Sequence, residues 1–229
     1  MAYPEHPNEI IIQNKFYPKG LKEIDCYNYY QKYKGLILNE TRGRDLMLAI
    51  MVEKNKPVLR RKLNARFIQL TNSNYDKIIH PRVVAIYSTM KFYEEFFIID
   101  IDCNVFRFAK KATMDVYNSI SKLPILSEIK LKFTGKESFH VICYTRQKNK
   151  IDNLKILAKN HLENDPNLRN YTIQHKRNPN VPNLDLSPNK INGAYITTNS
   201  LSIWGLKCME LSYNEMKNFV PSRAEIEVK

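Results

Sequence analysis

The chain has 229 residues, enough for one large domain or two small ones, and its apolar content of 43% is ordinary for a globular protein. Its apolar runs are too short to cross a bilayer and its N-terminus lacks a signal-peptide pattern, so we expect a soluble cytoplasmic protein. Lysine and arginine number 36 against 23 aspartate and glutamate, a formal net charge of +13. This excess favours nucleic acid as a partner, with an inert basic surface as the alternative.

The cysteines are Cys26, Cys103, Cys143 and Cys208, and they lie far apart in the sequence. Their spacing fits neither a zinc site nor a disulfide framework. We therefore expect buried thiols in a reducing compartment, and no zinc.

The N-terminal part of the chain mixes helical and strand patterns. The expected elements are an extended arm over 1–18, a helix over 19–35, a basic turn over 42–44, a strand over 46–52 and a strand over 78–87. Gly35 is the expected C-cap of the helix. The cationic stretch Arg60-Arg61-Lys62 is either a solvated face or a phosphate contact.

The C-terminal part begins with a strand, a helix and a hairpin. The expected elements are a strand over 96–102, a helix over 110–122, strands over 128–133 and 138–144 joined by a turn over 134–137, a helix over 151–163, a short strand over 171–174, a loop over 176–183, short strands over 184–187 and 193–198, and a helix over 212–219. Ser212 and Glu215 predict a capping box at the last helix. The βαββ order is that of a ferredoxin-like or RNA-recognition-like unit.

Two aspartates end the most apolar of these strands. In Phe96-Phe97-Ile98-Ile99-Asp100-Ile101-Asp102 the run is rich in aromatic and β-branched residues, which is typical of a buried strand. Asp100 and Asp102 are two residues apart and so point to the same face. Carboxylates that close repel each other unless a cation lies between them, and such oxygen donors suit Mg²⁺ or Mn²⁺. The alternative is a strand that merely ends in polar residues.

Further polar residues follow in the hairpin and beyond it. Ser138 and His140 also share a strand face, beside a turn that contains Thr134 and Lys136, and such a group could grip phosphate oxygens. His140 alone would more often be a core histidine. Asp185 is a third acid, which alone would mean little.

Together these motifs resemble the archaeo-eukaryotic primase superfamily, and within it the polymerase domain of bacterial DNA ligase D and its stand-alone archaeal relatives. The matching segments are His6-Pro7, Lys19 to Tyr30, Gly43 to Leu46, Asp100 and Asp102, Thr134 to His140, Asp185 with Ser187 and Asn189, and Met209 to Met216. The resemblance spans nearly the whole chain and keeps the order of its parts.

The sequence departs from the family pattern at three places. Tyr87 stands where the family has a histidine, although His80 lies nearby. The segment over 199–202 lacks an arginine that helps to hold the nucleotide in the family, and Lys207 or Arg223 could compensate. The glycine-rich motif over 134–140 has lost two glycines.

The resemblance implies an α+β fold, with an RNA-recognition-like antiparallel or mixed sheet, flanking helices and an N-terminal α/β module. It implies a single catalytic domain over 1–229, with the module over about 1–80 and the catalytic sheet over about 81–229. It also assigns roles to residues. The metal ligands would be Asp100, Asp102 and Asp185; the nucleotide would be bound by Thr134, Lys136, Ser138, His140, Ser187 and Asn189; and DNA or its 5′-phosphate would be bound by Lys15, Lys19, Lys22, Arg44, Arg61 and Lys62.

These assignments predict a template-directed nucleotidyltransferase that uses two Mg²⁺ or Mn²⁺ ions to extend primers or fill gaps. The resemblance implies a preference for ribonucleotides, a role in double-strand break repair by end joining, and association with the nucleoid. It leaves open a separate DNA ligase and a Ku-like protein as partners, besides DNA and NTPs or dNTPs. The alternatives are a replicative or mobile-element primase, a phosphohydrolase, and a non-catalytic nucleic-acid-binding module.

Overall fold

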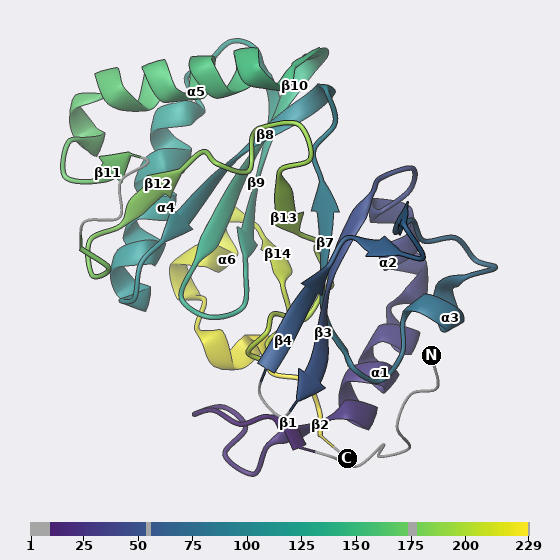
Figure 1. Ribbon diagram of the computed structural model, residues 1–229. Helices are drawn as coiled ribbons and strands as arrows, with labels where there is room; N and C mark the ends of the chain where they lie inside the picture. Colours follow the sequence, from purple (N-terminus) through teal and green to yellow (C-terminus); the bar gives the residue numbers. More distant parts are fainter. Residues whose placement is uncertain (1–9, 54–55, 174–177, 229) are drawn as a thin grey trace. The chain divides into compact units, whose positions relative to one another are not determined.

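The computed structural model describes residues 10–53, 56–173 and 178–228, and contacts divide the chain into two compact units (Figure 1). The first unit contains the chain up to Ser88, Ile196–Cys208 and the residues from Pro221 onward. The second unit contains Thr89–Tyr195 and Met209–Val220. The chain therefore passes between the units several times, whereas the sequence suggested one boundary near residue 80.

The second unit is built on a βαββαβ succession. Its elements are β8 (Tyr93–Asp102), α4 (Phe106–Ile120), β9 (Leu126–Phe133), β10 (Phe139–Lys150), α5 (Ile151–Asn164) and β12 (Asn183–Asp185). These strands lie in the antiparallel order β12-β8-β10-β9, and β11 (Thr172–Ile173) and β14 (Met209–Leu211) extend the sheet to six strands. The α+β architecture expected from the βαββ pattern is confirmed.

The two faces of this sheet differ in chemistry. Phe97, Ile99 and Ile101 of β8 are fully buried, and α4 and α5 pack against β8 and β10 on one face (Figure 1). Each such side chain contributes about 1.5–3 kcal/mol when it leaves water. Because side chains alternate along a strand, Asp100 and Asp102 point to the opposite face.

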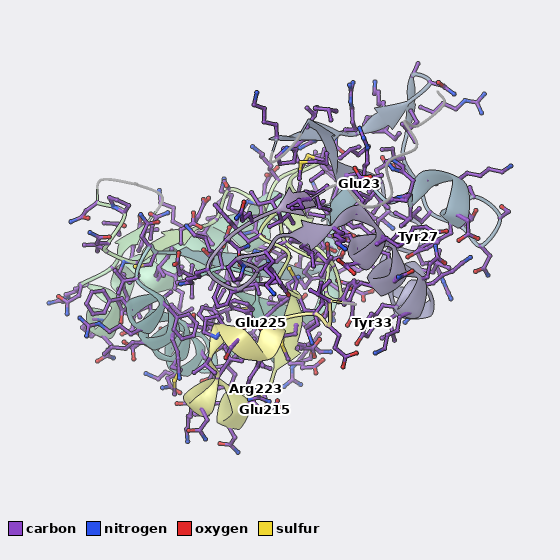
Figure 2. All side chains as sticks on the ribbon, turned by 90° about the horizontal axis from the view of Figure 1, so that it is seen from below. Glu23, Tyr27, Tyr33, Glu215, Arg223 and Glu225 are labelled. Atoms are coloured by element: carbon purple, nitrogen blue, oxygen red, sulfur yellow. The ribbon has the colours of Figure 1, made fainter. Side chains whose placement is uncertain are left out.

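Aromatic packing fixes the end of the sheet where β9 and β10 meet. The rings of Phe106, Phe133, Phe139 and Phe219 form one cluster, with 4.8 Å between the centroids of Phe133 and Phe219. Phe219 follows the short helix α6 (Tyr213–Asn218), on which Figure 2 marks Glu215.

The predicted capping box of α6 is confirmed. The Ser212 hydroxyl accepts the Glu215 N–H at 3.2 Å, and the Glu215 carboxylate accepts the Ser212 N–H at 2.8 Å. Two donors at the start of the helix are thereby satisfied.

The remaining elements form smaller sheets and short helices. They are β1 (Ile10–Ile12) with β2 (Leu21–Lys22), a four-stranded sheet in the order β13 (Ala194–Ile196), β7 (Val83–Thr89), β3 (Leu46–Glu53) and β4 (Lys56–Arg60), the pair β5 (Lys62–Leu63) and β6 (Arg66–Phe67), the helices α1 (Glu23–Lys32), α2 (Lys34–Glu40) and α3 (Tyr75–Ile78), and the 3₁₀ turns η1 (Pro166–Leu168) and η2 (Pro221–Ala224). In the described part of the chain, no helix is both long and apolar enough to cross a bilayer.

The prediction that Gly35 caps a helix over 19–35 was wrong. α1 ends at Lys32, with Tyr33, which Figure 2 marks, as its C-cap, and α2 then continues through Gly35 to Glu40. Gly35 is not among the residues with positive φ, so it supplies none of the left-handed geometry of a glycine cap. Fully buried Ile37 anchors the continuation instead.

Other boundaries moved by a few residues. The strand expected over 78–87 begins only at Val83, after α3 and a turn, and the helix expected over 110–122 already begins at Phe106. The strands β4, β5, β6 and β14 were not anticipated, and β2 occupies residues that were expected to begin the helix over 19–35. The expectation of buried thiols is confirmed, since all four cysteines are buried thiols. The motif at His6-Pro7 and the predicted segments at 174 and 176–177 lie outside the described residues.

Candidate active site

Three carboxylates meet where β8 and β12 run side by side. Asp100 and Asp102 are at the end of β8, Asp185 is at the end of β12, and the strand register places Asp185 opposite Asp100. Each residue offers a carboxylate oxygen, and these oxygens all lie within 4.8 Å of one another. The side chains are half-buried. The sequence pattern paired the first two acids, and the fold brings in the third.

Such a cluster has an electrostatic preference for cations. Two unit charges at this separation repel by several kcal/mol near a protein surface. Because a third carboxylate adds to this repulsion, binding of a compensating cation is strongly favoured. The donors are all hard oxygens, which suits Mg²⁺ or Mn²⁺ rather than a thiolate-seeking metal. The residues present therefore fit the metal chemistry that the sequence suggested.

Asp185 is held in place by the residues that follow it. The backbone N–H of Ser187 donates to its Oδ1 at 2.8 Å, and the Ser187 hydroxyl donates to its Oδ2 at 2.7 Å. These bonds fix the carboxylate rotamer. Ser187 thus contacts an acid of the cluster, whereas the sequence had assigned it to the nucleotide.

Asn189 completes this support. Its side-chain amide accepts the Ile98 N–H at 2.8 Å and donates to the Ile98 carbonyl oxygen at 2.5 Å. The amide thereby continues the hydrogen bonding of β8 past the last residue of β12, as a further strand residue would. Asn189 is fully buried, so it anchors the Asp185 loop to the strand that carries Asp100.

His140 lies next to Asp100 across the β8–β10 pair. Its Nε2 is 3.6 Å from Oδ1 of Asp100, and its Nδ1 is buried without a hydrogen-bond partner. Burial, with the positive charge of Lys132, holds the pKa of His140 well below its usual range. The imidazole is therefore neutral near pH 7, with a ring nitrogen that has not used its hydrogen-bonding capacity.

The turn between β9 and β10 carries the remaining predicted nucleotide ligands. Gly135 has φ of 97°, a conformation that favours glycine, and the Thr134 N–H donates to the Ser138 carbonyl at 3.1 Å. The Lys136 ammonium is 3.2 Å from the Glu137 carboxylate. The Ser138 hydroxyl donates to Oδ1 of Asp102 at 3.4 Å, so this turn also adjoins the acids.

The basic residues assigned to DNA all belong to the first unit, whereas the acids and His140 belong to the second. These residues are Lys15, Lys19, Lys22, Arg44, Arg61 and Lys62. Lys15, Lys19, Arg61 and Lys62 are exposed. Lys207 and Arg223, the suggested substitutes for the missing arginine, belong to the first unit as well.

The sequence reasoning missed one residue of this site, Lys132. It lies on β9 directly opposite His140, and its side chain is fully buried. A signal was available, because Lys130 and Lys132 alternate with Ile129, Leu131 and Phe133. That alternation puts both lysines on one face of β9, and the register with β10 and β8 makes it the face that carries the acids.

No family model matches the chain, and no curated protein matches it. Among solved structures, the chain is similar to the polymerase domain from Mycobacterium tuberculosis ligase D in complex with DNA, with a TM-score of 0.73 and 12% sequence identity. The match covers 92% of this chain and 89% of that one. The chain therefore has the fold of that polymerase domain, as the sequence resemblance implied.

Proposed function

We propose that this protein is a metal-dependent nucleotidyltransferase that adds nucleotides to a DNA primer under the direction of a template. The observation that carries the proposal is the convergence of Asp100, Asp102 and Asp185 beside a buried His140 with an unused ring nitrogen. The likeness of the fold to a polymerase domain solved with DNA supports it. The net charge of +13 suits a nucleic-acid substrate.

The three acids would hold two Mg²⁺ or Mn²⁺ ions, and these, when bound, lower the charge cost of attack by a 3′-hydroxyl on a triphosphate. Ser187 and Asn189 keep Asp185 in position, so the acid set is organised before substrate arrives. His140, whose Nε2 lies 3.6 Å from Oδ1 of Asp100, would orient the triphosphate beside the acids. Thr134, Lys136 and Ser138 line the adjoining turn and would orient the same triphosphate.

In this proposal, the protein fills gaps during end joining and prefers ribonucleotides. The cations of the first unit, Lys15, Lys19, Lys22, Arg44, Arg61 and Lys62, would contact the DNA backbone or a 5′-phosphate. A separate ligase and a Ku-like protein would act with the enzyme on broken ends.

A primer-extension assay with labelled nucleotides tests the proposal. The protein should extend a gapped duplex with Mg²⁺ or Mn²⁺, should stop with EDTA, and should release pyrophosphate. Release of inorganic phosphate would instead identify a phosphohydrolase. DNA binding without incorporation under any metal would identify a non-catalytic binding module. Synthesis on primer-free templates would favour a primase.

Replacement of His140 by alanine should raise the KM for the nucleotide by about tenfold, the cost of one charge-assisted hydrogen bond to phosphate. Affinity for DNA should change little, because His140 lies opposite Asp100 in the β8–β10 pair and not among the exposed cations. Steady-state kinetics and thermal melting, measured together, check this result. A lower melting temperature with an unchanged KM would make His140 a structural residue.

The second prediction concerns the 5′-phosphate on the downstream side of a gap. Lys19 is exposed and Lys22 directly precedes α1, so two cations three residues apart would hold a phosphate at the start of this helix. Gaps with a 5′-phosphate should therefore bind more tightly than gaps ending in a hydroxyl, and the preference should weaken with salt. Titration of both substrates with the Lys19→Ala, Lys22→Ala double variant should show no preference.

The matched control is Lys159→Ala, which removes an exposed lysine from α5 in the second unit. It should keep the preference for the phosphorylated gap. Equal affinity of the unaltered protein for both gaps would argue against gap repair and favour a primer-making enzyme.

A further inference from the structure

In the sheet of the second unit, five neighbouring strands each contribute one residue to a row that runs across the strands. The strand register aligns Glu210 of β14, Lys132 of β9, His140 of β10, Asp100 of β8 and Asp185 of β12. Paired residues on neighbouring strands point to the same face. Lys132 is therefore the nearest neighbour of His140 on the side away from the acids.

Lys132 is among the largest fully buried side chains of the protein, together with tyrosines and phenylalanines. A buried ammonium costs free energy, so it requires compensation from its surroundings. Part of this comes from Tyr195, whose ring centroid is 5.4 Å from the Lys132 Nζ, within cation–π range. The neighbouring Lys130 is partly exposed, and its ammonium lies 2.9 Å from the Glu210 carboxylate.

The two sides of His140 therefore carry opposite charges. Asp100 lies on one side, 3.6 Å from Nε2, and Lys132 lies on the other. A nucleotide whose α-phosphate is held at the acids would place its remaining phosphates, which carry most of the negative charge, away from those acids. The row runs from the acids to His140 and then to Lys132.

We infer that Lys132 is a fixed positive charge that attracts the β- and γ-phosphates of the bound nucleotide. It lies on the side of His140 that faces away from the acids. This inference rests on the proposed function and extends it to a residue that recognises the triphosphate tail. Because Lys132 is buried, it acts through space and not by direct contact. A unit charge about 7 Å from another, at an effective dielectric constant of about 20, changes a binding constant roughly 50-fold.

The test compares a triphosphate with a monophosphate in the absence of chemistry. The protein is mixed with Mg²⁺ and a primer-template whose primer ends in a dideoxynucleotide and whose templating base is thymine, and the Kd values of ATP and AMP are measured. In the Lys132→Met variant the preference for ATP over AMP should fall by about tenfold or more, while AMP affinity stays within about twofold. Lys132→Arg, which keeps the charge, should retain the preference.

Lys130→Met is the matched control, since it removes a lysine from the same strand and the same face, and it should keep the preference for ATP. An unchanged preference in a folded Lys132→Met or Lys132→Gln protein would overturn the inference. So would failure of both uncharged variants to fold while Lys132→Arg folds, because Lys132 would then serve the stability of the sheet. If the unaltered protein neither binds ATP nor extends primers, the proposed function itself fails.

Discussion

Replacement of Asp102 by alanine should reduce nucleotide addition by about three orders of magnitude or more. Metal ions contribute several kcal/mol to the stabilisation of charge in such a transition state, and each 1.36 kcal/mol corresponds to about a tenfold change in rate. Asp102 supplies one of the three oxygens that lie within 4.8 Å of one another. Single-turnover primer extension measures the loss, and Asp100→Ala and Asp185→Ala should behave alike.

The stability of these variants should move in the opposite direction. Without metal, removing one of three neighbouring carboxylates relieves repulsion, so the melting temperature should stay constant or rise. Addition of Mn²⁺ should raise the melting temperature of the unaltered protein but not that of Asp102→Ala. Glu128→Gln, which removes an exposed acid from β9, is the control and should leave both measurements unchanged. Near-normal extension by Asp102→Ala would remove the two-metal assignment.

Replacement of Asn189 by alanine should lower the free energy of unfolding by about 2–4 kcal/mol. The variant leaves both the N–H and the carbonyl of Ile98 without their partner in a buried strand, and each unsatisfied group costs about 1–3 kcal/mol. Urea denaturation measures the change. Asn153→Ala on the exposed side of α5 should be close to neutral.

The same variant should also weaken metal binding, because Asn189 ties the loop after Asp185 to β8. Mn²⁺ affinity, measured by the shift in melting temperature, should fall in Asn189→Ala although no ligand has been removed. Loss of stability with full metal affinity would mean that the β12 ladder alone positions Asp185. A neutral effect on stability would contradict the structural role of the amide.

Several features of the protein follow from local patterns in the sequence. Asp100 and Asp102 share a face because side chains alternate along any strand, and the apolar run before them identified that strand. The capping box at Ser212 was predictable because both of its partners lie within one helical turn. The βαββ order needed only the change between helical and strand periodicity. Gly35 shows the limit of such rules, since packing of Ile37 extended the helix past it.

Other features depend on which strands are neighbours. The family resemblance had already named Asp185, but only the tertiary structure shows how these features arise. Asp185 joins the acids because β12 pairs with β8, and Asn189 has its role because Ile98 lies beside it, 91 positions away in the chain. Lys132 belongs to the site because β9 pairs with β10 in a register that sets it opposite His140. Pairing and register arise because one face of the sheet is buried against α4 and α5. That burial adds up contributions from residues that are distant in sequence, so no local pattern contains it.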